Sequence, residues 1–451
     1  MTSAPREDDV ATRLDRLPFT PKLGRVLTGS GLGWALDAMD VGLISFIIAA
    51  LGAQWQLGKE ELGLISSVGF VGMAVGASLG GLLADKFGRR QVFALTLLVY
   101  GVATGASALV GGLALLLVLR FIVGLGLGSE LPVASTYVSE FAPARIRGRV
   151  VVLLEAFWAV GWLAAAVIGV LVVPSSPDGW RWAFALGAIP AVYALIVRWG
   201  LPESARWLES RGRHSEADLI VRQFEESARG RTAPAPTVAA AAAEQAVPKE
   251  NIRGRLRALF APEFRGRTLS LWLVWFCVNF SYYGAFIWIP SLLVAQGYTL
   301  VKSFEFTLII TLAQLPGYAV AAWLIEVWGR RITLSVFLIG SAVAAVLYGT
   351  AGDPTGIIIA GMLLSFFNLG AWGALYAVSP ETYPTSLRAT GSGWAAGVGR
   401  IASIVAPLVV PWVLGWGSVP ILFVVFAVFF AIAAIATWGL SDLRGRALDN
   451  R

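Results

Sequence analysis

The stretch Gly81-Leu82-Leu83-Ala84-Asp85-Lys86-Phe87-Gly88-Arg89-Arg90 decides the fold, because it sets a charged turn between two long apolar runs. The runs cover about residues 61–84 and 91–111. A helix that crosses a bilayer needs about 20 mostly apolar residues, whereas a membrane β-barrel shows segments of about ten residues with alternating hydrophobicity. Continuous runs of this length therefore predict two membrane-spanning helices joined by a short charged loop.

The composition of the whole chain is that of a membrane protein. Of 451 residues, 57% are hydrophobic and 14% are charged, and the mean hydropathy is +0.72. Soluble domains contain about 45–50% apolar and about 25% charged residues. A single cysteine, Cys277, excludes an intrachain disulfide and a cysteine-based metal centre. A single histidine, His214, argues against a Ser-His-Asp triad and against a histidine-rich metal centre. We expect no metal and no cofactor.

The apolar runs predict an all-α membrane protein with twelve transmembrane helices. Residues 1–23 are polar and lack the apolar core of a signal peptide, so we expect the first helix to remain as an anchor. The predicted spans are 24–52, 61–84, 91–111, 113–138, 149–173, 182–200, 268–296, 303–328, 331–351, 355–379, 390–414 and 417–440.

Positive charge is concentrated in alternate loops, which predicts the orientation of the chain. The basic residues of these loops include Lys86, Arg89, Arg90, Arg145, Arg147, Arg149, Arg330, Arg331 and Arg388. We therefore expect a multi-pass protein of the cell inner membrane with both termini in the cytoplasm. The formal net charge of +7 follows from this topology, so we expect no nucleic-acid partner.

A long charged segment, 201–267, separates the first six spans from the last six. Its part 232–248 is an Ala/Pro tract of low complexity, typical of a flexible tether. The flanking parts, 203–229 and 249–259, are expected to form short amphipathic helices on the membrane surface. The predicted division is an N-terminal tail, a six-helix half, the cytoplasmic loop, a second six-helix half and a C-terminal tail, at 1–23, 24–200, 201–267, 268–440 and 441–451.

The two halves repeat each other at an offset of 241 residues, as between Trp34 and Trp275. The same offset relates the stretch 85–90 to 326–331, and it relates Glu140 to Glu381. Duplication of a six-helix unit explains a shared offset. The halves are then parallel repeats about an axis along the membrane normal, with a ligand site between them near the midplane.

The opening stretch resembles the loop signature of the major facilitator superfamily of transporters. The stretch 120–128 (RFIVGLGLG) resembles a second motif of that superfamily, and 202–208 (PESARWL) resembles a signature of its sugar-porter-like branch. This resemblance covers the whole chain. It implies two six-helix halves that open the site alternately to either side of the membrane.

A closer resemblance is to bacterial niacin (nicotinate) transporters, and related synaptic-vesicle proteins share parts of the pattern. The matching stretches are 33–42, 130–136, 153–158, 280–284 and 365–376. This resemblance implies import of nicotinate or a closely related small aromatic monocarboxylate, and we expect symport with a proton. The expected protein is a monomer in the lipid bilayer.

Charged residues at the loop ends form a doubled set. Its members are Asp85, Gly88, Arg89, Arg90, Glu140, Arg147, Glu326, Arg330, Arg331, Glu381 and Arg388. The superfamily resemblance implies that they latch the two halves in the outward-open state and separate when the site opens inward. The alternative is a topology signal combined with helix capping.

Charges inside the predicted spans are costly and usually functional. Asp37 and Asp40 are three residues apart and share a helix face, where two carboxylates at low dielectric favour retention of a proton. The alternative is that they bond to neighbouring helices or neutralise an arginine. Arg120, Glu130 and Glu155 complete the expected proton-coupling set. A static ion pair for Arg120 and a gate or packing contact for Glu155 are the alternative roles.

Arg400 lies near the middle of the span 390–414, whereas the equivalent position of the first half is Ala159. The repeated fold therefore does not require this charge. A guanidinium group binds a carboxylate through two hydrogen bonds, so we expect Arg400 to hold an acidic ligand. The alternative is an ion pair with Asp37 or Asp40.

Aromatic and amide side chains at helical spacing accompany this arginine. They are Trp158, Trp275, Asn279, Tyr282, Tyr283, Asn368, Trp372 and Tyr376. Lipid does not favour Asn and Tyr in the middle of a span, but a flat heteroaromatic acid fits between aromatic faces with one arginine. Arg400 would bind its carboxylate, and Asn or Tyr would meet the ring nitrogen.

Two alternative functions stay open. The first is proton symport of a sugar or another organic acid, although the span 268–296 lacks the glutamine pair that sugar porters carry there. The second is a ligand-binding membrane protein of the same fold without transport. An enzyme is not expected, because the chain has no phosphate-binding loop of the Walker type and no clustered nucleophile and base.

Overall fold

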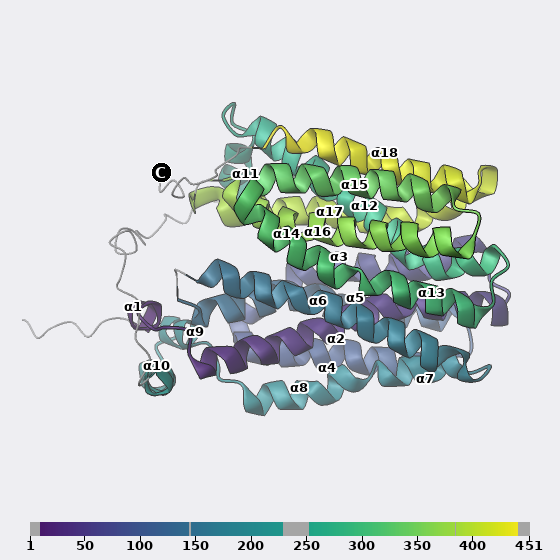
Figure 1. The fold of residues 1–451 in the computed structure, drawn as a ribbon. Helices are drawn as coiled ribbons and strands as arrows, with labels where there is room; N and C mark the ends of the chain where they lie inside the picture. Colours follow the sequence, from purple (N-terminus) through teal and green to yellow (C-terminus); the bar gives the residue numbers. More distant parts are fainter. Residues whose placement is uncertain (1–9, 144–145, 229–251, 384, 441–451) are drawn as a thin grey trace, which may run out of the picture.

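The computed structural model describes residues 10–143, 146–228, 252–383 and 385–440, and these residues form two six-helix halves (Figure 1). The first half contains α2 (Pro21–Gln54), α3 (Lys59–Phe87), α4 (Arg89–Ser107), α5 (Leu113–Phe141), α6 (Arg147–Leu171) and the pair α7 (Gly179–Leu186) and α8 (Ile189–Gly200). The second contains α12 (Arg265–Ala295), the pair α13 (Leu300–Leu312) and α14 (Gln314–Trp328), α15 (Arg330–Thr350), α16 (Pro354–Glu381), α17 (Thr385–Trp416) and α18 (Val419–Thr437). This arrangement confirms the predicted all-α membrane fold.

Eleven of these passes are long and apolar enough to cross a membrane. The twelfth, α4, has 19 residues and begins with Arg89 and Arg90; it packs between α5 and α8. Two predicted spans are each broken into two helices, before Pro190 and Pro316. Proline has no backbone N–H and its ring crowds the preceding turn, which interrupts the helix.

Glycine allows α3 and α5 to approach until their backbones touch. A Cβ atom at Gly72 or Gly76 of α3 would lie against the backbone of α5, and one at Gly124 or Gly128 would lie against α3. In lipid, where apolar surfaces gain nothing by leaving the solvent, close backbone contact of this kind stabilises helix pairs. The stripe of small residues that follows Arg120 in the sequence therefore packs α5 onto α3.

Four short helices gather at one end of the bundle, which we call the terminal end: α1 (Val10–Asp15), α9 (Ala205–Ser210), α10 (His214–Ala228) and α11 (Ile252–Leu259) (Figure 1). The last three confirm the helices predicted in the segment 201–267, whereas its Ala/Pro tract lies outside the described residues. The apolar face of α10 packs on protein and not on the membrane surface, because Phe224 stacks on Phe141 with ring centroids 5.0 Å apart.

The two halves contact each other mainly away from the terminal end. There, α3 packs against α17 and α6 packs against α13. Ser67 of α3 donates a hydrogen bond of 2.8 Å to the backbone oxygen of Ile404 in α17. Nearer the terminal end of α17, a Cβ atom at Gly393 or Gly397 would have no protein atom within 4 Å. The described residues therefore leave open space beside α17 near the terminal end, and the halves touch farther along α3 and α17.

The contact between α3 and α5 predicts that Gly76→Ala destabilises the protein. The added methyl group would overlap the backbone of Leu125, and overpacking of this kind costs about 1–3 kcal/mol. We expect a lower apparent melting temperature by fluorescence-detected size exclusion. Gly81→Ala on the same helix is the control, since nothing lies within 4 Å of that position. Equal melting temperatures for the two variants would contradict the proposed packing.

Candidate substrate site and charge networks

A cavity lies between the two halves. Its walls come from α2, α6, α12, α14, α16 and α17. The lining residues are Trp34, Glu155, Trp158, Trp275, Asn279, Tyr282, Tyr283, Tyr318, Trp372, Tyr376, Ala396 and Arg400. A cavity lined by both halves agrees with the predicted position of the site.

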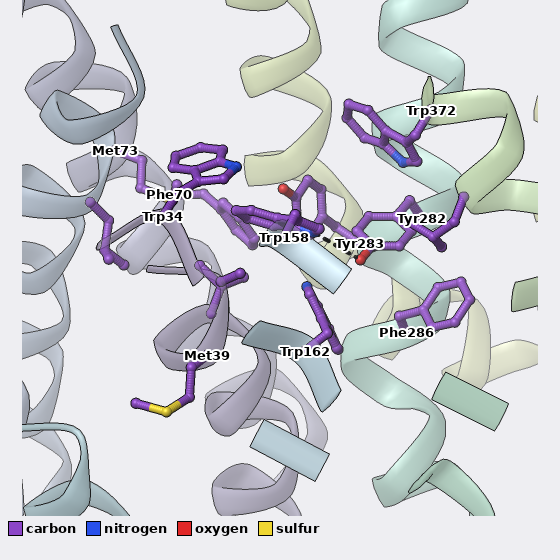
Figure 2. Close-up of a cluster of buried hydrophobic side chains, with 14 of the residues drawn as sticks. Trp34, Met39, Phe70, Met73, Trp158, Trp162, Tyr282, Tyr283, Phe286 and Trp372 are labelled. Atoms are coloured by element: carbon purple, nitrogen blue, oxygen red, sulfur yellow. Dashed lines mark hydrogen bonds between the residues drawn. The ribbon is translucent and has the colours of Figure 1, made fainter. Parts of the chain in front are cut away.

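Aromatic rings form most of the cavity wall, and both halves contribute them (Figure 2). On the first half, Trp34 and Trp158 lie with ring centroids 5.2 Å apart. On the second half, Trp372 stacks on Tyr376 at 5.7 Å, and Trp275 stands edge-on to both. Rings in fixed contact with one another present flat, rigid faces on which a planar ligand can stack.

Several polar atoms of the wall are already used within the protein. Asn279 donates from Nδ2 to the backbone oxygen of Trp275 at 2.8 Å, and its Oδ1 accepts from the Ser403 hydroxyl at 3.0 Å. The indole N–H of Trp158 donates to the Tyr282 hydroxyl oxygen at 3.4 Å, across the interface between the halves. These bonds orient the wall and use one N–H donor and one acceptor site of the Asn279 amide.

Arg400 reaches the cavity from α17 as a half-buried cation. Its Nη1 lies 3.9 Å from the Met73 sulfur of α3, which is a weak partner, and the Tyr283 hydroxyl lies beside its guanidinium group. No carboxylate of the described residues lies within 4.0 Å of its guanidinium nitrogens. The predicted alternative, an ion pair with Asp37 or Asp40, is therefore absent from this conformation.

Asp40 pairs instead with Arg120 of α5. Arg120 Nη1 lies 3.3 Å from Asp40 Oδ2, and the Thr104 hydroxyl donates to Asp40 Oδ1 at 2.7 Å. Arg120 also donates to that hydroxyl at 3.2 Å and lies over the Phe184 ring at 5.1 Å. Both charged side chains are at most 5% exposed, so each compensates the burial of the other.

The other three membrane carboxylates lie apart from this pair. Asp37 is completely buried, and neither of its oxygens has a hydrogen-bond partner among the described residues. Glu130 is also buried, beside Tyr100 and close to Gly33 of α2. Glu155 lines the cavity itself, where it is 8% exposed. The expected coupling residues thus all lie in the N-terminal half, and Glu155 is the one of them that lines the cavity.

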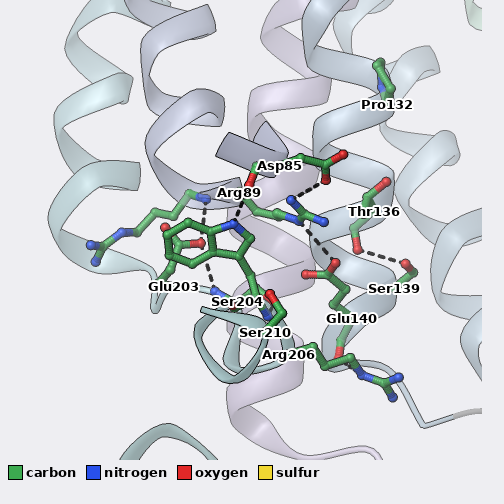
Figure 3. A network of polar contacts seen from close by, with 12 residues as sticks. Asp85, Arg89, Pro132, Thr136, Ser139, Glu140, Glu203, Ser204, Arg206 and Ser210 are labelled. Atoms are coloured by element: carbon green, nitrogen blue, oxygen red, sulfur yellow. Dashed lines mark hydrogen bonds and ion pairs between the residues drawn. The ribbon is translucent and has the colours of Figure 1, made fainter. Parts of the chain in front are cut away.

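The predicted latch residues of the first half form a compact network at the terminal end (Figure 3). Arg89 lies 2.7 Å from Asp85 and 3.2 Å from Glu140. The signature stretch 202–208 packs beneath it, since Glu203 accepts from the Arg90 backbone N–H at 3.0 Å. Outside the spans, Gly88 supports this turn with a φ of +105°, a conformation that glycine adopts at low cost.

The second half repeats this arrangement. Arg330 lies 3.0 Å from Glu381, and Arg331 lies over the Trp438 ring at 4.7 Å. Arg147 belongs to a different contact, 3.1 Å from Asp15 next to α1. The side chains of Glu326 and Arg388 lie outside the described residues. The ion pairs of Arg89 with Asp85 and Glu140, and of Arg330 with Glu381, each join helices of one half, and the latch function stays a prediction.

The cavity contains eight of the nine residues predicted to bind substrate. Asn368 is the exception: it is completely buried one turn beyond Trp372, and its amide makes no hydrogen bond to described residues. The sequence analysis did not assign Trp34 or Tyr318 to the site. Trp34 could have been found as the repeat partner of Trp275, whereas Tyr318 offered no signal beyond its proximity to Pro316.

Comparisons with known proteins agree with this architecture. Residues 38–446 match the family described as "Sugar (and other) transporter". The chain is 46% identical to the niacin transporter NiaP of Acinetobacter baylyi over 446 residues, which cover 98% of this chain and 99% of that protein. It is 47% identical, over 91% of its length and 92% of the relative, to a Bacillus subtilis protein whose name, given with a provisional qualifier, is niacin/nicotinamide transporter NiaP.

A solved structure shows the same fold at low sequence identity. It is the xylose transporter XylE from E. coli in a partially occluded inward-open conformation, with a TM-score of 0.74 and 20% identity, covering 94% of this chain and 99% of that one. Together with the cavity between two six-helix halves, these matches identify the family. The chain belongs to the sugar (and other) transporter family, and the relatives named above are transporters and not enzymes.

Proposed function

We propose that this protein imports nicotinate, or a closely related small aromatic monocarboxylate, across the cell inner membrane. The observation that carries the proposal is Arg400, a cation without a carboxylate partner among the described residues, in a cavity with aromatic walls. A half-buried guanidinium at membrane depth favours an anion, and the rings around it favour a flat one. The name of the Acinetobacter baylyi relative supports the same substrate.

The proposed transport cycle is alternating access. With the terminal end in the cytoplasm, as the loop charges predict, the separation of the halves at that end corresponds to an inward-facing state. Aromatic residues from both halves line the cavity, so a bound ligand touches both and can favour their approach. Rocking of one half against the other would then move the site from one side to the other.

The proposed coupling ion is the proton, and Asp40 with Arg120 is its proposed central pair. Protonation of Asp40 would remove the attraction that holds α2 to α5, and Arg120 would then need another anion. Asp37, three residues along the same helix, is fully buried without a hydrogen bond and offers a second proton site. A monomer contains all of these groups and is the proposed transporting unit.

Arg400→Ala is predicted to abolish nicotinate binding, with a loss of about 100-fold or more in affinity, because the carboxylate loses a charge-assisted bidentate partner. Binding of the neutral amide nicotinamide should change much less. Calorimetry on the purified protein would measure both. Arg198→Ala, at an exposed position on α8, is the control. Equal loss for acid and amide would show that Arg400 is structural.

Asp37→Asn and Asp40→Asn are each predicted to uncouple uptake from the proton gradient, because the amide cannot take up a proton. Labelled nicotinate should still exchange across proteoliposome membranes, while accumulation driven by an inward proton gradient should fall to background. The exchange reaction serves as the control for folding. Gradient-driven accumulation that persists in both variants would remove these carboxylates from the coupling mechanism.

Sugar transport is the alternative that these experiments also test. The family description and the fold of the xylose transporter permit it. The amide of Asn279 is engaged within the protein, and the cavity wall contains no other amide among the described residues. A hexose that displaces labelled nicotinate, or is taken up in its place, would favour this alternative.

A further inference from the structure

Glu155 is the one acidic side chain among the described residues that line the cavity. It lies on α6, in the half opposite to Arg400, and 92% of its surface is covered. The Trp34 indole lies beside its carboxylate. No lysine or arginine of the described residues forms an ion pair with it. A carboxylate at the cavity wall can accept more hydrogen bonds than the Trp34 indole provides, and the ligand can donate one.

The repeat shows that neither charge of the cavity serves the fold. At the offset of 241 residues, Glu155 corresponds to Ala396, and Arg400 corresponds to Ala159. Equivalent helices of the two halves thus carry one charge each, of opposite sign and one helical turn apart in register. Alanine occupies each equivalent position without loss of the helix. The two charges therefore belong to the cavity and its ligand.

We propose that Glu155 binds the ring nitrogen of a pyridine carboxylate whose carboxylate is held by Arg400, and thereby selects pyridine carboxylates over benzoate. This inference rests on the proposed function, because it assumes the same site and the same class of acid. Nicotinate has its carboxylate and its basic nitrogen at different ring positions, so it can face opposite walls at once. One proton, on the nitrogen or on Glu155, completes the hydrogen bond.

The remaining polar groups of the wall support this assignment. Asn279, expected from its sequence position to meet the ring nitrogen, is engaged by Ser403 and by the backbone of Trp275. The Tyr282 hydroxyl oxygen accepts from Trp158. The hydroxyl groups of Tyr283, Tyr318 and Tyr376 stay on the C-terminal half together with Arg400. The first half thus contributes tryptophan rings and one carboxylate, and only the carboxylate is a strong acceptor for a ring N–H group.

The test compares nicotinate with benzoate, which has the same carboxylate and no ring nitrogen. Both are titrated against the purified full-length protein by calorimetry, for the wild type, Glu155→Ala, Glu155→Gln and Arg400→Lys. We expect the wild type to bind nicotinate at least about tenfold more tightly than benzoate, the order expected for one hydrogen bond to a charged group. Glu155→Ala should bring this ratio close to one while benzoate affinity stays within about twofold.

The two further variants separate this role from a structural one. Glu155→Gln should keep part of the preference, because its amide N–H can donate to an unprotonated ring nitrogen. Arg400→Lys should weaken both acids by a similar factor, because both present the same carboxylate.

Four outcomes would overturn the inference or its foundation. Equal affinities in the wild type, or an unchanged ratio in Glu155→Ala with benzoate still bound, would overturn the role of Glu155 alone. If Glu155→Ala binds neither acid, the folded Glu155→Gln variant decides. A ratio of nicotinate to benzoate affinity equal to that of the wild type would then overturn the role. Absence of binding of both acids to the folded wild type would overturn the proposed function itself.

Discussion

Burial of charge at membrane depth is the constraint on which the functional part of this structure depends. A buried ion without a partner is costly, so each intramembrane charge must be compensated within the protein or by something that the protein binds. Arg120 is compensated by Asp40, through a contact of 3.3 Å that Thr104 supports. Arg400 has no such carboxylate among the described residues and lies beside the Met73 sulfur and the Tyr283 hydroxyl. Arg120 therefore belongs to an internal ion pair of the N-terminal half, whereas Arg400 is the group proposed to bind the ligand.

The architecture explains how such a charge can be tolerated. Each half is packed tightly within itself, by the glycine contacts between α3 and α5 and by the charged turns at Arg89 and Arg330. The interface between the halves is less continuous, because it contains the cavity and opens at the terminal end. The repeated unit thus forms two tightly packed halves. The residues that differ between the repeats, such as Arg400 and Glu155, line the cavity between them.

Much of this organisation could be predicted from the sequence, because it depends on patterns along one helix. Long apolar runs predicted the spans, and the offset between Trp34 and Trp275 predicted the two halves. Helical spacing placed Trp372 and Tyr376 on the same face. These patterns extend only as far as a helix stays regular, so the interruptions before Pro190 and Pro316 were not resolved as separate helices.

Contacts between helices could not be predicted in the same way. Which aspartate meets Arg120 depends on the rotation of α2 against α5, which helical spacing alone does not determine. Asn368 lies one helical turn from Trp372 on the same face, but it is buried outside the cavity. The apolar face of α10 packs on Phe141 of α5 and not on lipid. Tyr318 reaches the site from a helix whose sequence is otherwise typical of a lipid-facing span.

The most direct test of the central claim is uptake of labelled nicotinate into proteoliposomes, with and without an inward proton gradient. The account predicts concentrative uptake that requires the gradient and is blocked by unlabelled nicotinate but not by a hexose. No uptake of nicotinate by folded, reconstituted protein, or uptake blocked equally by the hexose, would contradict it.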